Sequence, residues 1–222
     1  MKAIIVTSTR PYTGKSGIAL TLVGILSDRG HDVGYFKPYG TMPTTSDGVL
    51  TDEDALFINR TLGRPSPLDA VCPVVRSQAF VEDILGGAAP PSAESVASAY
   101  ARCAEGRDLM IVEGPTEPAQ GAAAGLGAQA IASLLNARVL LVDRPKPTDL
   151  PEDALYEAAA LGDRLGGIVL NGIQEARLAV TREQVAPFLE NRGFPVFGAI
   201  GHDPELGSVT VAEIVDALGG TV

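Results

Sequence analysis

Short apolar runs alternate with longer segments of helical composition along this 222-residue sequence, and this alternation restricts its fold more than any other feature. Continuous apolar strands need cover on both sides, so the alternation is typical of a parallel sheet with helices on both faces. We therefore expect an α/β fold in three layers around a mostly parallel central sheet. The expected strands are 3–7, 33–36, 109–112, 138–142, 167–170 and 196–200, and the expected helices are 16–29, 92–105, 122–136, 151–165, 181–192 and 211–218.

Glycines and loop-forming residues mark where these elements end. Gly30, Gly106 and Gly193 each follow a helical run, where a left-handed C-cap is expected. Segments 86–91 and 115–127 are rich in Ala, Gly and Pro and are expected to be loops, because the alternation resumes after each. Between residues 41 and 87 we expect irregular structure around one helix at 52–62. A chain of this length commonly forms one domain, so we expect residues 1–222 to be a single domain.

Composition limits the partners of the chain. It has 17 Lys and Arg against 27 Asp and Glu, a formal charge of -10, and no basic run that could follow a nucleic acid backbone. No segment reaches about 20 uninterrupted apolar residues, and no apolar leader follows Met1. Cys72 and Cys103 lack metal-binding or redox spacing. We therefore expect a soluble, cytoplasmic protein with no nucleic acid or membrane partner.

The stretch IIVTSTRPYTGKSGIALTL, residues 4–22, has the parts of a phosphate-binding loop. Such a loop needs a strand before it, a close backbone approach, a Lys for the terminal phosphates and a hydroxyl for Mg²⁺ at a helix N-terminus. Gly14, Lys15 and Ser16 supply the last three, and a helical run begins at Gly17. Thr9 stands where the pattern G-x-x-x-x-G-K-[ST] has its first glycine. The alternative is an ordinary turn with a lysine before a helix.

A Mg²⁺-dependent phosphate site also needs carboxylates, because this metal prefers oxygen ligands. Glu113 ends the apolar strand in DLMIVEGPTEP, at the edge of the sheet where open α/β sheets bind ligands. Asp52, Glu53 and Asp54 precede or begin the expected helix 52–62. Helix capping is the favoured role for Asp52, and a favourable first-turn charge is the alternative for Asp54.

Six motifs together resemble the dethiobiotin synthetase-like superfamily of P-loop proteins. They are VTSTRPYTGKS, VGYFKP, DEDAL, IVEGP, GGIVLNGI and FGAIGHDPEL, and they occur in that superfamily's order. The sequence is most similar to the dethiobiotin-synthetase-like N-terminal domain associated with phosphotransacetylase. A threonine in place of the first loop glycine is normal in the superfamily. The resemblance covers nearly the whole chain and implies the three-layer P-loop NTPase fold; since the sequence stops at Val222, we expect the module that follows this domain to be absent.

The resemblance also implies ATP and Mg²⁺ as cofactors, a homodimer, and a set of site residues. The implied metal site consists of Ser16, Asp54 and Glu113. Lys15 and Lys37 would act on the transferred phosphate, and a small anionic substrate could lie beside Lys37. The implied nucleotide-binding residues are Thr9, Arg10, Thr13, Gly14, Lys15, Ser16, Gly17 and Asn171.

Three of these assignments have a further argument. Lys37 directly follows the apolar run VGYF, which places it at the carboxyl edge of the sheet; a solvent-exposed lysine is the alternative. Asn171 closes the strand GGIVLN, where the superfamily has an Asn against the adenine, and an amide offers a donor and an acceptor in one plane. Arg10 takes the position of the signature lysine of related deviant-loop ATPases, whose cation reaches across a dimer.

Positions at which this sequence differs from the superfamily's motifs help to decide which reaction, if any, the chain catalyses. Dethiobiotin synthetases carry VEGAGG and a Pro-His pair, whereas this chain has EGPTE at 113–117 and no Pro-His. The amidating synthetases carry an amidotransferase domain for which 222 residues leave no room. The favoured hypothesis is an ATP-binding, slowly hydrolysing regulatory module of the phosphotransacetylase-associated type. The alternatives are a divergent ATP-dependent carboxylating or amidating synthetase, such as dethiobiotin synthetase, and a degenerate fold used for assembly.

Overall fold

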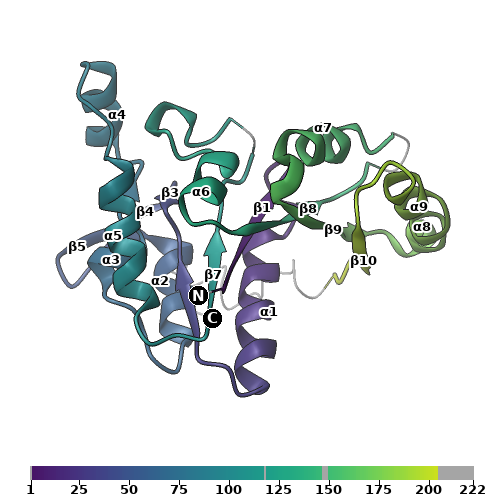
Figure 1. Ribbon diagram of the computed structural model, residues 1–222, viewed down its shortest axis with the longest axis horizontal. Coiled ribbons are helices and arrows are strands. Elements are labelled where there is room, and N and C mark those ends of the chain that lie inside the picture. The colour runs from purple at the N-terminus through teal and green to yellow at the C-terminus, as the bar shows by residue number, and fades with distance from the viewer. Residues whose placement is uncertain (1, 118, 147–149, 205–222) are drawn as a thin grey trace, which may run out of the picture.

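The computed structural model describes residues 2–117, 119–146 and 150–204 (Figure 1). The helix expected at 211–218 therefore lies outside the described residues. Within them, no helix is long and apolar enough to cross a membrane.

Six parallel strands form the central sheet, in the order β10-β9-β8-β1-β7-β2. All six were predicted from their apolar runs. The middle residues of the five strands other than β10 are buried, among them Ile5, Ile111 and Leu141, because helices cover both faces of the sheet, whereas the edge strand β10 has no buried residue. The strands are β1 (Lys2–Ser8), β2 (Val33–Phe36), β7 (Leu109–Glu113), β8 (Arg138–Asp143), β9 (Leu165–Ile173) and β10 (Val196–Gly201).

The direction of each crossover decides which face a helix covers. The connection from β1 to β2 contains α1 (Lys15–Asp28) and runs toward the β2 edge of the sheet. The next three connections, from β2 to β7, from β7 to β8 and from β8 to β9, run toward the opposite edge. Because crossovers between parallel strands are right-handed, α1 lies on the opposite face from the helices of those connections. Figure 1 shows α1 below the sheet and α6 and α7 above it, which confirms the three-layer α/β fold. The helices opposite α1 are α5 (Ala93–Ala104), α6 (Ala128–Leu134) and α7 (Glu152–Leu161).

Glycines set several helix ends. Gly30, Gly106 and Gly193 have φ of +87°, +67° and +85°, which confirms the predicted left-handed C-caps. The helix expected at 122–136 is instead a 3₁₀ turn, η1 (Ala122–Ala124), and α6, because Gly125 has φ +67° and breaks the run. The helix expected at 151–165 ends at Leu161, where Gly162 with φ +51° begins the 3₁₀ turn η2 (Gly162–Arg164).

The helix expected at 181–192 is longer at its N-terminal side than predicted. The helical segment consists of three consecutive parts: α8 (Glu175–Val180), the π-helical turn η3 (Thr181–Val185) and α9 (Ala186–Glu190). These turns pack beside β10 at one end of the molecule (Figure 1).

The segment between β2 and α5 holds more regular structure than the sequence predicts. A hairpin of β4 (Pro43–Ser46) and β5 (Val49–Asp52) turns at Asp47 and Gly48, both with positive φ. Its strands are largely polar, so no apolar run marks them. The predicted helix at 52–62 is present as α2 (Glu53–Thr61), with Asp52 as its N-cap. The other elements are β3 (Tyr39–Gly40), α3 (Leu68–Val71), β6 (Val74–Val75) and α4 (Gln78–Leu85).

Candidate functional site

The loop between β1 and α1 leaves the start of α1 uncapped by any side chain. Gly14 precedes the helix with φ +89°, and a Cβ there would lie 2.3 Å from Asn171 Nδ2. The left-handed φ favours glycine at this position, and an added Cβ would also displace the Asn171 side chain. The hydroxyl of Thr13 is buried without a hydrogen-bond partner. An unpaired buried donor beside free helical N–H groups suits an oxyanion ligand.

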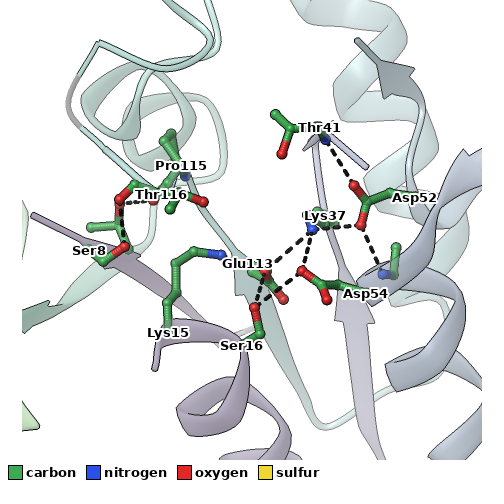
Figure 2. A network of polar contacts seen from close by, with 12 residues as sticks. Ser8, Lys15, Ser16, Lys37, Thr41, Asp52, Asp54, Glu113, Pro115 and Thr116 are labelled. Atoms are coloured by element: carbon green, nitrogen blue, oxygen red, sulfur yellow. Dashed lines mark hydrogen bonds and ion pairs between the residues drawn. The ribbon is translucent and has the colours of Figure 1, made fainter. Parts of the chain in front are cut away.

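The first two residues of α1 point toward the strand edge at β7. Lys15 Nζ lies 2.5 Å from Glu113 Oε1, and both side chains are buried. Ser16 Oγ lies 3.0 Å from the same carboxylate oxygen and 3.3 Å from Asp54 Oδ2 (Figure 2). The structure thus brings together the lysine, the hydroxyl and both carboxylates that the resemblance implied.

Lys37 joins this cluster from the end of β2. Its Nζ lies 2.6 Å from Asp52 Oδ1, 3.1 Å from Asp54 Oδ2 and 3.4 Å from Glu113 Oε1 (Figure 2). Lys37 is buried, so the alternative of a solvent-exposed lysine at a strand end is wrong. Two lysines and three carboxylates share one site, the phosphate-side cluster formed by Lys15, Lys37, Asp52, Asp54 and Glu113.

Asp52 has two structural roles in this cluster. It caps α2 by accepting from the backbone N–H of Ala55, as predicted, and it also accepts from the N–H groups of Thr41 and Met42. Its contact with Lys37 was not predicted. Asp52 therefore fixes Lys37 relative to both α2 and the β4–β5 hairpin.

Mutual contacts set the charge states of the cluster. Burial alone would raise the pKa of Glu113, but Lys15 and Lys37 outweigh it and lower that pKa to about 2. Burial also lowers the pKa of Lys37, but the carboxylates of Glu113, Asp52 and Asp54 outweigh it, and the net pKa is raised. For Lys15 burial is the stronger effect, and its pKa is lowered despite Glu113.

Thr9, Arg10, Thr13 and Asn171 form contacts on the β8 and β9 side of the loop. Thr9 Oγ1 donates to Asp143 Oδ1 at 2.7 Å, and Asn171 Nδ2 donates to the carbonyl of Thr13 at 2.7 Å. Arg10 donates to the carbonyl of Arg144. A Cβ at Gly17 would meet nothing within 4 Å, so packing does not require glycine there.

Two buried residues of the site were missed from the sequence. The Tyr35 hydroxyl donates to Glu113 Oε2 at 2.7 Å, and Tyr35 lies two residues before Lys37 on the same side of β2. That spacing could have identified it. Asp143 ends the apolar strand β8 as Glu113 ends β7, which is the signal that was overlooked.

The side-chain oxygens beside Ser16 suit a Mg²⁺ ion that also binds phosphate. They suit less well a metal ion whose ligands all come from the protein. Ser16, Asp54 and Glu113 offer a hydroxyl and two carboxylates, and Ser16 Oγ lies 3.3 Å from Asp54 Oδ2 and 3.0 Å from Glu113 Oε1. Among residues 2–117, 119–146 and 150–204, no group of three or more His, Cys, Asp or Glu forms a metal cage. Mg²⁺ commonly uses one or two carboxylates, waters and substrate phosphates, so the residues fit it.

A loop that joins the strand β1 to a helix beginning with Lys and Ser, on a parallel sheet covered on both faces, defines the P-loop class of nucleotide-binding domains. Residues 2–210 match the AAA domain family AAA_26, and the chain belongs to that family.

Relatives found by sequence are phosphate acetyltransferases. The enzyme of Pseudomonas putida is 26% identical over 100% of this chain and 32% of its own length. That of Nitrosomonas europaea is 29% identical over 98% of this chain and 32% of its own length. The chain thus spans about a third of the length of the curated relatives it matches, in their N-terminal region. This confirms the predicted resemblance.

Solved structures with the same fold include three P-loop proteins. The MinD cell division protein of Aquifex aeolicus has a TM-score of 0.57 at 15% identity, covering 93% of this chain and 85% of its own. A ParA family ATPase of Chlorobium tepidum has 0.55 at 16%, covering 99% and 94%. A nucleotide-binding protein of Archaeoglobus fulgidus, solved in complex with ADP, has 0.52 at 17%, covering 92% and 83%. At these identities the likeness establishes the fold.

Proposed function

We propose that this chain binds ATP in a Mg²⁺-dependent manner, hydrolyses it slowly, and acts as a regulatory module of the phosphotransacetylase-associated type. The observation that carries the proposal is the shared contact of Lys15, Ser16 and Lys37 with Glu113 Oε1 at the start of α1. A lysine and a hydroxyl at a helix N-terminus, facing a carboxylate at the end of a parallel strand, is the arrangement that phosphate and Mg²⁺ require.

The residues divide into roles along the ligand. The uncapped start of α1 and Lys15 would bind the phosphates, and Ser16, with Asp54 and Glu113 acting directly or through water, would hold Mg²⁺. The metal would neutralise charge on the phosphates. Lys37 would reach the terminal phosphate from β2, and Asp52 orients Lys37. Asn171, held against the loop by the Thr13 carbonyl, would face the adenine.

A divergent synthetase is the second candidate, and the buried Lys37 beside Ser16 and Asp54 is the observation that favours it. Such an enzyme needs free positive charge for an anionic substrate. Lys37, however, already contacts three carboxylates. We therefore expect no dethiobiotin above background from ATP, Mg²⁺, bicarbonate and diaminopelargonate, whereas robust product would favour the synthetase.

Association of two chains is part of the proposal, because a regulatory nucleotide site must act on a partner or a second copy. The resemblance implies a homodimer. Sedimentation of the protein with MgATP, with MgADP and without nucleotide tests this. We expect a dimer at micromolar concentration, and a monomer under all three conditions would contradict it.

Thermal unfolding tests nucleotide binding. A ligand that binds only the folded state raises the melting temperature, so MgATP and MgADP should each raise it. Lys15→Ala should remove most of the shift, while Lys2→Ala, at the exposed amino end of β1, should retain it. The absence of a shift with any purine nucleotide would contradict the proposal. Adenine should be preferred over guanine, because the guanine-selective N-K-x-D pattern is absent from the sequence.

A further inference from the structure

A positively charged pocket lies beside the phosphate-binding loop, at the carboxyl ends of β8 and β9. Its volume is about 230 Å³, and Arg10, Arg144, Lys146 and Arg177 are among the residues that line it. No Asp or Glu is among the described residues of its lining. The chain as a whole carries a formal charge of -10, so four cations around one pocket are a local reversal of its charge. A concave surface of one sign attracts ligands of the other sign.

Two of the four cations have no carboxylate partner in the part of the chain that the structure describes. Arg144 lies across Gly172, where a Cβ would come within 3.0 Å of Arg144 Nε, so the absence of a side chain at Gly172 makes room for the guanidinium. Arg177 reaches the pocket from α8. Neither side chain forms an ion pair among the described residues, whereas Asp153 lies 4.0 Å from Arg10 and 3.7 Å from Lys146. Arg144 and Arg177 are both half-buried.

The pocket continues the proposed nucleotide site on the side away from Mg²⁺. Glu113 is on β7, on one side of β1, whereas Arg144 directly follows β8 and Asn171 lies within β9, both on the other side of β1. Asn171 contacts the loop directly, and Arg10 belongs to the loop itself. If the terminal phosphates are at Lys15, the nucleoside end of the ligand lies toward this pocket. The inference therefore rests on the proposed function.

We propose that the pocket binds a phosphate group on the ribose of an adenine nucleotide, attached at O2′ or O3′, in addition to the 5′ phosphates. Adenine and an unmodified ribose are uncharged and leave the guanidinium groups of Arg144 and Arg177 without an anionic partner. A phosphate monoester supplies acceptors for paired guanidinium hydrogen bonds, which are stronger than bonds between neutral groups. The ligand class is thus a ribose-phosphorylated adenosine diphosphate.

Calorimetric titration with three ligands tests the proposal at fixed ionic strength and Mg²⁺ concentration. The ligands are ADP, ADP with a phosphate on O3′, and ADP with a phosphate on O2′. We expect one phosphorylated form to bind about tenfold more tightly than ADP or better, the scale of a charge-assisted contact. The form that gains affinity identifies the attachment point.

Two charge-matched variants separate the pocket from the overall charge of the protein. Arg177→Gln should abolish the advantage of the added phosphate, while Arg29→Gln, which removes one charge at the exposed end of α1, should preserve it. Equal affinity of all three ligands would overturn the proposal and leave the nucleotide site intact; it would indicate that the guanidinium groups stack on the base. Loss of the advantage in both variants, or its survival in both, would also overturn it. Failure of all three ligands to bind would instead contradict the proposed function.

Discussion

At the scale of single residues, Glu113 is the centre of the site. Its carboxylate contacts Lys15, Ser16, Lys37 and Tyr35, and its side chain is buried. Protonation of this buried side chain would remove its ion pairs with Lys15 and Lys37. The stability of the folded protein therefore depends on pH through Glu113.

The pKa of Glu113 gives that link a direction. It falls from an ordinary value of 4.5 to about 2 in the folded protein, so the folded state binds its proton less readily than the unfolded state. The resulting stability, on the order of 3 kcal/mol, is fully present above pH 4.5 and is lost as pH falls toward about 2. Urea unfolding of wild type and Glu113→Gln should show a wild-type advantage at pH 7 that shrinks between pH 5 and 3. A gap that does not change with pH would contradict this coupling.

At the scale of elements, the junction between the phosphate-binding loop and α1 depends on a glycine with a left-handed φ, Gly14. Gly14→Ala would place a methyl group against Asn171 at a left-handed φ, and we expect it to lower the free energy of unfolding by about 1–3 kcal/mol and to displace Asn171. Gly24→Ala is the matched control, because that glycine is inside α1 and a methyl group added there would meet nothing within 4 Å. It should stabilise the protein by about 0.5–1 kcal/mol. Urea titrations of the two variants measure both effects, and similar stability changes would contradict the assignment.

Elements with an apolar run could be predicted from the sequence, and those without one could not. The six sheet strands and α1 follow from buried apolar residues and from the phosphate-loop pattern. The hairpin of β4 and β5 could not be predicted, because its strands PTTS and VLTD show no apolar alternation. Lys15, Ser16 and Glu113 stand at recognisable positions of the pattern, so their proximity was foreseeable. The pocket of Arg144 and Arg177 was not, because separate loops and helices contribute single cations that form no motif.

At the scale of the whole molecule, the site divides along the sheet. The phosphate-side cluster lies at β7 and β2, and the positively charged pocket lies at β8 and β9, with the loop after β1 between them. In the proposed complex, this order would place the acidic residues Asp54 and Glu113 near the phosphate end of the nucleotide and the cations of the pocket near its nucleoside end. The chain spans about a third of the length of its phosphate acetyltransferase relatives. A regulatory role would require nucleotide binding at this site to change the conformation or activity of another domain or chain.

The central claim is that ATP binds with Mg²⁺ at the start of α1, and the most direct test is the affinity for ATP measured by calorimetry with and without Mg²⁺. We expect Mg²⁺ to tighten binding to the wild type about tenfold or more. Asp54→Asn should lose most of this gain while its metal-free affinity stays within about twofold, and Asp83→Asn, on the exposed side of α4, should behave as wild type. A wild type that binds ATP equally well without Mg²⁺, or an Asp54→Asn variant that keeps the full gain, would contradict the account.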